Sequence, residues 1–314
     1  LHGNGGNGNG MVAQHINVLG CHVLVAPTGY ENSWNICGEK SDAPDMEMVN
    51  DLVNLLQGYE NVNPNQIRIL GSSNGAGLAN RAFIESTNPG IDLVCAVVSH
   101  LNEPQYHSGG FHKPSSSTDS SAPHCGYDVL TNPLTTRKYL SISNTNDQII
   151  PYEGGTSVVG VDFLPAEEAA YIIAQNQGYT GSQLESGTPI GNPEIFEFSY
   201  LSGKVVHIKG DAAHGRNATQ SDYIKSFFSD CAITVGLEDS QLEEIKVYPN
   251  PIHSLIRIER VSSKAMPYSI FNTLGQEVLI GISTSKTMQI DLSELPANVY
   301  FLKADSRVVK MIKQ

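Results

Sequence analysis

Gly71-Ser72-Ser73-Asn74-Gly75 is a Gly-x-Ser-x-Gly motif with the potential for nucleophilic chemistry. An apolar run at residues 66–70 precedes it and predicts a buried strand, and the small residues at 76–83 predict a helix. Between a strand and a helix, the serine of this motif occupies a tight turn that exposes its hydroxyl near the positive end of the helix. Ser73 is therefore the candidate nucleophile.

A serine nucleophile needs a base to take its proton and a carboxylate to orient that base. In sheets of this kind the chain order is Ser, then Asp or Glu, then His, each in a loop after a strand. Asp147 follows the predicted strand at residues 139–143, and His214 follows the predicted strand at 204–208. His207 lies inside that last strand and is the weaker alternative for the base.

The glycine-rich start, residues 1–10, can be interpreted in two ways. It is either a flexible linker or a turn whose backbone N–H groups approach the substrate carbonyl, which only glycine-rich backbone permits. The one tryptophan, Trp34, lies in the following loop, either as a packing anchor or as a substrate contact. We interpret the chain as starting inside a motif, after a truncation or processing step.

Residues 101–136 form the longest stretch without predicted elements. Loops of this length are disordered or functional, often as lids or substrate walls. Three histidines lie in it, His107, His112 and His124, but their spacing matches no zinc motif. We expect surface histidines there and no metal site or cofactor in the protein.

Charge is unevenly divided along the 314 residues. Residues 1–235 carry 10 Lys or Arg against 23 Asp or Glu, which accounts for the whole net charge of −13, whereas residues 236–314 carry nine of each. An acidic domain is a poor partner for nucleic acid or anionic membrane. No apolar run approaches the ~20 residues of a membrane span. A neutral substrate is expected.

The five cysteines all precede residue 235. Cys95 lies inside an apolar run and is expected to be a buried free thiol. Cys37, Cys125 and Cys231 lie near loops or element ends, and they could form disulfides in an exported protein, although sequence does not give the pairing.

Alternating predicted strands and helices extend to about residue 231, which indicates an α/β fold with a mostly parallel sheet and helices on both faces. One further strand is expected at residues 22–26. The boundaries we predict are a domain at 1–235, an acidic linker at 236–244 and a domain at 245–314. Short strands at turn spacing predict a small all-β sandwich for the last part.

Four stretches in residues 1–231 carry a resemblance to a known family: Leu1-His2-Gly3-Asn4-Gly5-Gly6, the Ser73 motif, Asp147 followed by Pro151-Tyr152-Glu153-Gly154-Gly155, and His214-Gly215. Through them, this part of the chain resembles secreted esterases of the α/β-hydrolase superfamily. The relevant members are related to polyhydroxybutyrate depolymerases and feruloyl esterases. The resemblance implies a doubly wound sheet, here without its first strands. It also implies Ser73 as nucleophile, Asp147 as acid and His214 as base, with the backbone N–H groups of Asn4 and Asn74 as the oxyanion hole.

Two departures from that family are visible. Its members have two or three strands before the His-Gly turn, which are absent here, so the stability of this chain is in question. Its histidine is often followed by Thr-Trp, where this chain has Gly215-Arg216. That change bears on the leaving-group side of the pocket.

Residues 245–314 resemble the C-terminal sorting domain of the Bacteroidetes type IX secretion system, through Val247-Tyr248-Pro249-Asn250-Pro251, Phe271 to Gln276 and a basic end. The resemblance implies export to the cell surface or medium and an interaction with the secretion machinery.

These features predict a secreted, monomeric serine esterase that acts on a neutral and possibly polymeric ester. A polyesterase and a feruloyl or acetylxylan esterase would share the same site. The alternative is a catalytically inert hydrolase-fold protein displayed on the surface for adhesion or binding.

Overall fold

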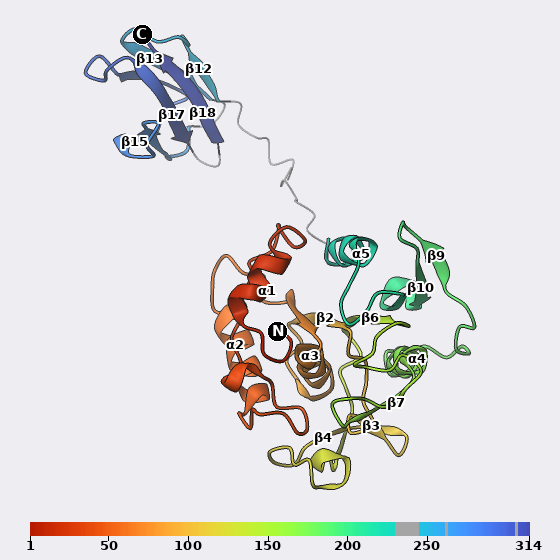
Figure 1. Ribbon diagram of the computed structural model, residues 1–314. Helices are drawn as coiled ribbons and strands as arrows, with labels where there is room; N and C mark the ends of the chain where they lie inside the picture. The colour runs from red at the N-terminus through yellow and green to blue at the C-terminus, as the bar shows by residue number, and fades with distance from the viewer. Residues whose placement is uncertain (230–244, 261–262, 305–306) are drawn as a thin grey trace. The chain divides into compact units, whose positions relative to one another are not determined.

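The structure is a computed structural model that describes residues 1–229, 245–260, 263–304 and 307–314. The chain divides into two compact units, Leu1–Cys231 and Ala232–Gln314 (Figure 1). The linker predicted at residues 236–244 lies outside the described residues.

A six-stranded sheet forms the centre of the first unit, in the order β1-β2-β6-β11-β10-β9. The strands are β1 (Ile67–Ser72), β2 (Ile91–Val97), β6 (Lys138–Asn144), β11 (Val205–Gly210), β10 (Ile195–Tyr200) and β9 (Thr188–Ile190). The first four are parallel, and β10 and β9 add antiparallel at one edge. The carboxyl ends of four strands therefore meet at one edge of the sheet.

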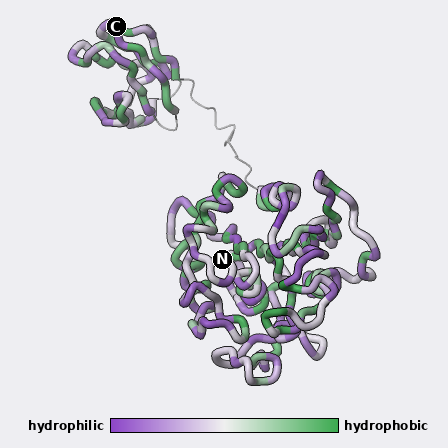
Figure 2. Tube along the Cα trace, viewed as in Figure 1, coloured by the Kyte–Doolittle hydropathy of each residue, from purple (hydrophilic) through white to green (hydrophobic). Residues whose placement is uncertain are grey.

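Helices cover both faces of this sheet. They are α1 (Gly8–His15), α2 (Asp45–Gln57), α3 (Asn74–Glu85), α4 (Ala166–Asn176) and α5 (Ala218–Phe228). Side chains of α2, α3 and α4 share one apolar core with the sheet, and Ile224 and Phe228 of α5 share a second core. Hydrophobic residues accordingly dominate the central strands in Figure 2. The first unit is a mixed α/β unit with a largely parallel sheet.

Local sequence explains where helix α5 begins and why helix α3 packs closely. Asn217 accepts a hydrogen bond from the N–H of Gln220, whose side chain accepts one from the N–H of Asn217, and this capping box starts α5. Helix α3 is rich in alanine and glycine and is buried on nearly all sides. Such a helix fits between the sheet and α2 because small side chains allow close packing.

The segment between β2 and β6 contains more structure than the sequence predicted. It holds a small sheet of β3 (Tyr106–His107), β4 (Gly110–Lys113) and β5 (Val129–Thr131). Strands β7 (Gly155–Thr156) and β8 (Asp162–Phe163) form a hairpin beyond β6. Short 3₁₀ turns occur at η1 (Tyr30–Asn32), η2 (Pro123–Gly126) and η3 (Leu201–Gly203).

The prediction of a strand at residues 22–26 is wrong, because these residues join no sheet and the side chains of Val23 and Val25 are exposed. The alternation of apolar residues there suits a strand but finds no neighbouring strand to pair with.

The second unit consists of two antiparallel sheets, β12-β13-β16 and β15-β14-β17-β18. The strands are β12 (Lys246–Tyr248), β13 (Leu255–Glu259), β14 (Met266–Phe271), β15 (Glu277–Ser283), β16 (Thr287–Asp291), β17 (Asn298–Ala304) and β18 (Arg307–Lys313). Both sheets contribute to one core, with Ile256 and Ile258 from β13 and Ile270 and Leu302 from the other sheet. The unit is therefore a small sandwich with its own hydrophobic core.

Candidate active site

Ser73 occupies the turn between β1 and α3 in a conformation that side chains rarely adopt, with φ 54° and ψ −121°. Its N–H donates to the carbonyl of Val97 at the end of β2, which fixes the turn. A Cβ at Gly71 would lie 2.0 Å from the carbonyl oxygen of Gly75, so glycine is required there. This turn raises the serine side chain above the carboxyl edge of the sheet.

His214 and Asp147 meet Ser73 at that edge. The Nε2 atom of His214 lies 2.7 Å from the Oγ atom of Ser73, and its Nδ1 atom lies 2.8 Å and 3.0 Å from the two carboxylate oxygens of Asp147. An ionised Asp147 can only accept, so Nδ1 carries a proton and the neutral imidazole accepts the serine proton at Nε2. The structure thus brings together the three residues that the sequence singled out.

Asp147 is kept ionised by its surroundings. Burial raises the pKa of its carboxyl, but hydrogen bonds from His214 and from the N–H groups of Ile150 and Ile149 outweigh that effect. The net pKa lies below the ordinary carboxyl value. Its side chain is 2% exposed, whereas that of His214 is 22% exposed and can be reached from solvent.

Asn144, at the end of β6, holds the histidine loop in place and was not identified from the sequence. Its amide nitrogen donates to the carbonyls of Ala213 and Gly215, on either side of His214. Its amide oxygen accepts a hydrogen bond from Gln220 of α5. The only sequence signal was its position at the carboxyl end of a strand, three residues before Asp147.

The backbone N–H groups of Asn4 and Asn74 are the candidate oxyanion donors predicted from the sequence. In the part of the chain that the structure describes, neither the N–H of Asn4 nor that of Asn74 donates to a protein atom. Residue 3 lies against the serine, since a Cβ at Gly3 would be 3.4 Å from the Cβ of Ser73. Neither N–H is therefore committed to a hydrogen bond within the described residues.

Trp34 does not lie where a substrate could touch it. Its side chain is fully buried, and its indole N–H donates to the carbonyl of His2. The sequence left two roles open for Trp34, a packing anchor or a substrate contact. The substrate contact is wrong, because the ring is packed in the core. His207 is also fully buried, and its Nε2 atom contacts the hydroxyl of Tyr152 rather than Ser73.

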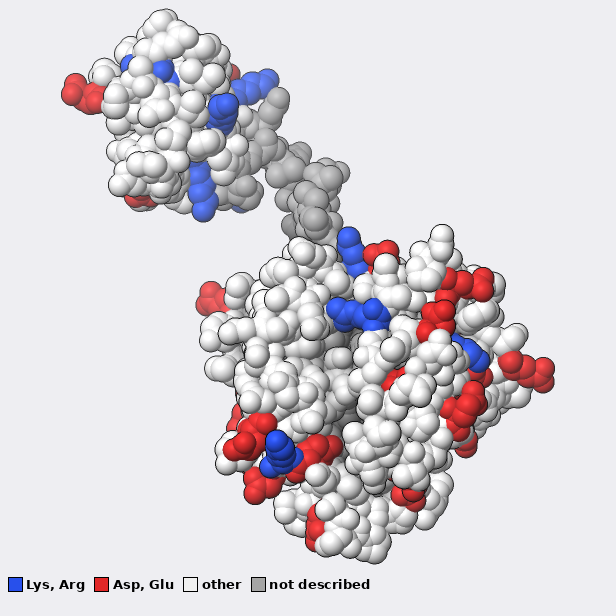
Figure 3. Space-filling view, in the orientation of Figure 1, with Lys and Arg blue, Asp and Glu red and all other residues white. Residues whose placement is uncertain are grey.

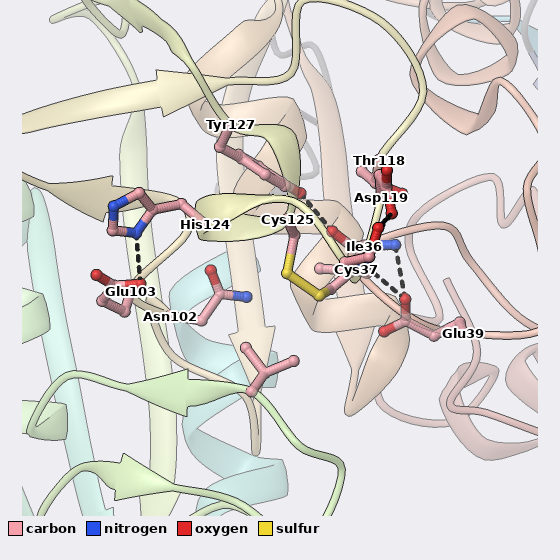
Figure 4. Close-up of a disulfide and its surroundings, with 12 residues drawn as sticks. Ile36, Cys37, Glu39, Asn102, Glu103, Thr118, Asp119, His124, Cys125 and Tyr127 are labelled. Atoms are coloured by element: carbon pink, nitrogen blue, oxygen red, sulfur yellow. Dashed lines mark hydrogen bonds and ion pairs between the residues drawn. A yellow bond between two sulfur atoms is a disulfide. The ribbon is translucent and has the colours of Figure 1, made fainter.

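A disulfide joins the loop after Trp34 to the 101–136 segment. Cys37 and Cys125 are bonded, and the Tyr127 hydroxyl donates to the carbonyl of Ile36 beside them (Figure 4). Cys95 is a buried free thiol, which confirms that prediction. Cys21 is also disulfide-bonded, and Cys231 lies outside the described residues.

The three histidines of the 101–136 segment stack on one another. The ring of His107 lies 3.7 Å from that of His112 and 3.8 Å from that of His124, centroid to centroid. His124 is paired with Glu103 at 2.8 Å (Figure 4). Parallel rings do not point their nitrogens at a common centre, and no cluster among the described residues has the geometry to hold a metal ion.

Acidic side chains outnumber basic ones on the face of the first unit that Figure 3 shows. No Lys or Arg contacts Ser73, His214 or Asp147 within the described ranges. Among the same residues, every helix is too short or too polar to cross a membrane.

Residues 246–314 match the family described as the secretion system C-terminal sorting domain. This domain marks proteins that type IX secretion exports to the cell surface or the extracellular space. The export predicted from the sequence is confirmed. None of the curated protein sequences compared with the chain is significantly similar to it.

Solved structures give a weaker likeness. A carboxylesterase from Bacillus cereus is 11% identical with a TM-score of 0.46, over 73% of this chain and 85% of that one. A DUF3244-family protein from Bacteroides vulgatus, with an immunoglobulin-like β-sandwich fold, is 18% identical with a TM-score of 0.18, over 22% of this chain and 90% of that one. Neither likeness carries an argument about activity, which has to rest on the site itself.

Proposed function

We propose that the protein is a secreted serine esterase of the α/β-hydrolase type that cleaves carboxylic esters through an acyl-enzyme. The observation that carries this proposal is the unbroken set of contacts from Ser73 through His214 to Asp147, with distances of 2.7 Å and 2.8 Å. The N–H groups of Asn4 and Asn74, which donate to no protein atom among the described residues, support it. The sorting domain supports a substrate met outside the cell.

The chemistry follows from these positions. Ser73 Oγ attacks the ester carbonyl while its proton passes to Nε2 of His214, and Asp147 stabilises the imidazolium that forms. The carbonyl oxygen becomes an oxyanion that the N–H groups of Asn4 and Asn74 can stabilise. When the intermediate collapses, the alcohol leaves with the proton from His214, and the acyl group stays on Ser73. A water molecule then attacks the acyl group with His214 again as base, releasing the acid.

The substrate class is the finer part of the proposal. The acidic unit and the absence of basic contacts to the triad among the described residues favour a neutral ester. The resemblance of residues 1–231 to polyester depolymerases and feruloyl esterases favours an ester within a polyester or attached to a polysaccharide. Gly215-Arg216 stands where that family has a Thr-Trp pair, and the Arg216 guanidinium contacts His15 and the carbonyl of Gln14.

Labelling with a fluorophosphonate tests the proposal. Such a reagent reacts only with an activated serine, so we expect one adduct per chain, located on Ser73 by peptide mass spectrometry. Turnover of short-chain, hydroxycinnamoyl and polyester substrates would then define the class. Absence of both labelling and turnover in folded protein would favour the inert surface protein instead.

A further inference from the structure

Trp34 touches both segments that supply the proposed oxyanion N–H groups. Its indole N–H donates to the carbonyl of His2 at 2.7 Å, two residues before Asn4. Its backbone N–H donates to the side-chain oxygen of Asn74 at 2.7 Å, and its carbonyl accepts from the side-chain nitrogen of Asn74 at 2.9 Å. One residue is thus bonded to the glycine-rich start and to the residue after the nucleophile.

The contact to His2 is held from both sides. The imidazole lies against the indole, with ring centroids 4.7 Å apart, and is buried. Its Nε2 atom accepts a hydrogen bond from the N–H of Gly29 at 2.9 Å, so Nδ1 bears the proton and donates to the carbonyl of Gly3 at 2.8 Å. Burial lowers the pKa of His2, which favours this neutral form. Residues 2 and 3 therefore have little freedom to move relative to Trp34.

The contact to Asn74 is anchored by the disulfide loop. The side-chain nitrogen of Asn74 also donates to Glu39 at 3.3 Å. The other carboxylate oxygen of Glu39 accepts from the N–H groups of Ile36 at 3.0 Å and Cys37 at 2.6 Å (Figure 4). Because Cys37 is bonded to Cys125, the loop that carries Trp34 is fixed three residues after the tryptophan.

We propose that Trp34 is a positioning residue of the oxyanion hole, which sets the spacing between the N–H groups of Asn4 and Asn74. This inference rests on the proposed esterase function. An oxyanion hole works only if its donors point at the place where negative charge develops, and a displacement of about 1 Å can cost about a hundredfold in rate. Asn4 and Asn74 lie on segments far apart in sequence, and Trp34 is hydrogen-bonded to both segments.

The variant Trp34→Phe tests this, since it keeps an aromatic ring in the core and removes the indole donor to His2 together with one of the two indole rings. The matched control is Tyr139→Phe, which removes one buried hydrogen bond, from the Tyr139 hydroxyl to Asn80 at 2.7 Å, without touching the site. Both should lower the melting temperature. For Trp34→Phe we expect kcat on a soluble ester to fall about tenfold to hundredfold with KM changed less than about twofold. Tyr139→Phe should keep both constants within about twofold.

Inhibition by an alkyl boronic acid supplies a readout that a purely structural role would not change. The boronate forms a tetrahedral adduct on Ser73, so its Ki should rise by the same factor as kcat/KM falls in Trp34→Phe and stay unchanged in Tyr139→Phe. Asn74→Ala breaks the other half of this link, the two hydrogen bonds between the Asn74 side chain and the Trp34 backbone, and should weaken kcat and boronate binding alike. The double variant should lose little more than the worse single variant, because either change alone already breaks the link from residue 2 through Trp34 to Asn74.

The variant Ser73→Ala distinguishes a failure of the esterase proposal from a failure of the positioning role of Trp34. If Ser73→Ala is inactive while folded Trp34→Phe keeps wild-type kcat and boronate affinity, the positioning role is wrong and the esterase proposal stands. If Ser73→Ala keeps its activity, the proposed function is wrong. Should Trp34→Phe fail to fold, Asn74→Ala decides in its place, and a wild-type kcat in that variant overturns the inference.

Discussion

His214 lies 2.7 Å from Ser73 although 141 positions separate the two residues in the chain. The contact exists because β1 and β11 are parallel members of one sheet, so the loops after them meet at the same edge. Asp147 reaches that edge from β6, which lies directly beside β11. Sheet topology, rather than sequence proximity, assembles the site.

Replacing Asp147 with asparagine should reduce kcat/KM by about 10³- to 10⁴-fold, because the imidazole would lose both its orienting partner and the charge that stabilises its protonated form. Asp211 lies in the same loop as His214 and makes no side-chain contact to it among the described residues. Asp211→Asn is therefore the matched control and should stay within about threefold of wild type. Equal losses of kcat/KM in the two variants would show that Asp147 does not orient His214.

Buried histidines should make the first unit sensitive to acid. Burial lowers the pKa of His207 to about 3 and that of His100 to about 4, against an ordinary value of 6.5. Between these values the unfolded chain binds protons that the folded chain does not, so stability is full above about pH 6.5 and falls as the pH decreases. Each such histidine contributes a slope of up to about 1.4 kcal/mol per pH unit.

Urea unfolding followed by the fluorescence of Trp34, the only tryptophan, measures this in the first unit alone. In His207→Gln, the slope of the free energy of unfolding against pH should decrease between pH 5 and 6.5 by the amount that corresponds to about one proton. The Nδ1 atom of His207 has no hydrogen-bond partner among the described residues, so the contact of Nε2 with the Tyr152 hydroxyl is the one hydrogen bond that the variant alters. An unchanged slope would show that His207 titrates normally when folded.

Removal of the Cys37–Cys125 disulfide should lower stability substantially. The bond spans 88 positions, and closing a loop of that length in the unfolded chain corresponds to about 4–5 kcal/mol on the chain-entropy estimate. We expect the melting temperature of the double alanine variant to fall by about 10 °C. Cys95→Ala, which removes a buried thiol without a crosslink, should cost less. Equal shifts for both would mean that the crosslink does not constrain the chain.

A protein shortened to end near Cys231 should keep most of its activity on small soluble esters, because the second unit has a separate core and supplies no triad residue. It should also fail to reach the surface of a host with type IX secretion machinery, since the sorting domain is gone. Turnover of both purified proteins on one soluble ester is the measurement. A loss beyond about tenfold, with circular dichroism showing an intact first unit, would mean that residues 246–314 shape the site.

The sequence predicted the elements whose signals are local. A motif between an apolar run and a small-residue helix located Ser73, and chain order pointed to Asp147 and His214. The sequence did not indicate the antiparallel strands β9 and β10, although they pair with segments close by in the chain. Strand β9 has only three residues, one of them a proline, and β10 has no regular alternation of buried and exposed residues. The sequence also suggested a strand at residues 22–26, where the alternating pattern is present without a partner.

The supporting contacts of the site could not be predicted because they join residues that are far apart in the chain. Asn144 bonds to the loop around His214 across about 70 positions, and Trp34 bonds to Asn74 across 40. Nothing in the local residue pattern distinguishes an asparagine or tryptophan that makes such a bond from one that does not. The fold has to bring the partners together before their role can be seen.

Hydrolysis of a soluble short-chain ester by Ser73→Ala measures whether Ser73 is the nucleophile, with Ser72→Ala as the control on the neighbouring residue. Both variants should be folded by circular dichroism. If Ser73 is the nucleophile, Ser73→Ala should lose activity by several orders of magnitude and take up no fluorophosphonate, while Ser72→Ala stays near wild type. Turnover by folded Ser73→Ala comparable to that of the wild type would show that Ser73 is not the nucleophile.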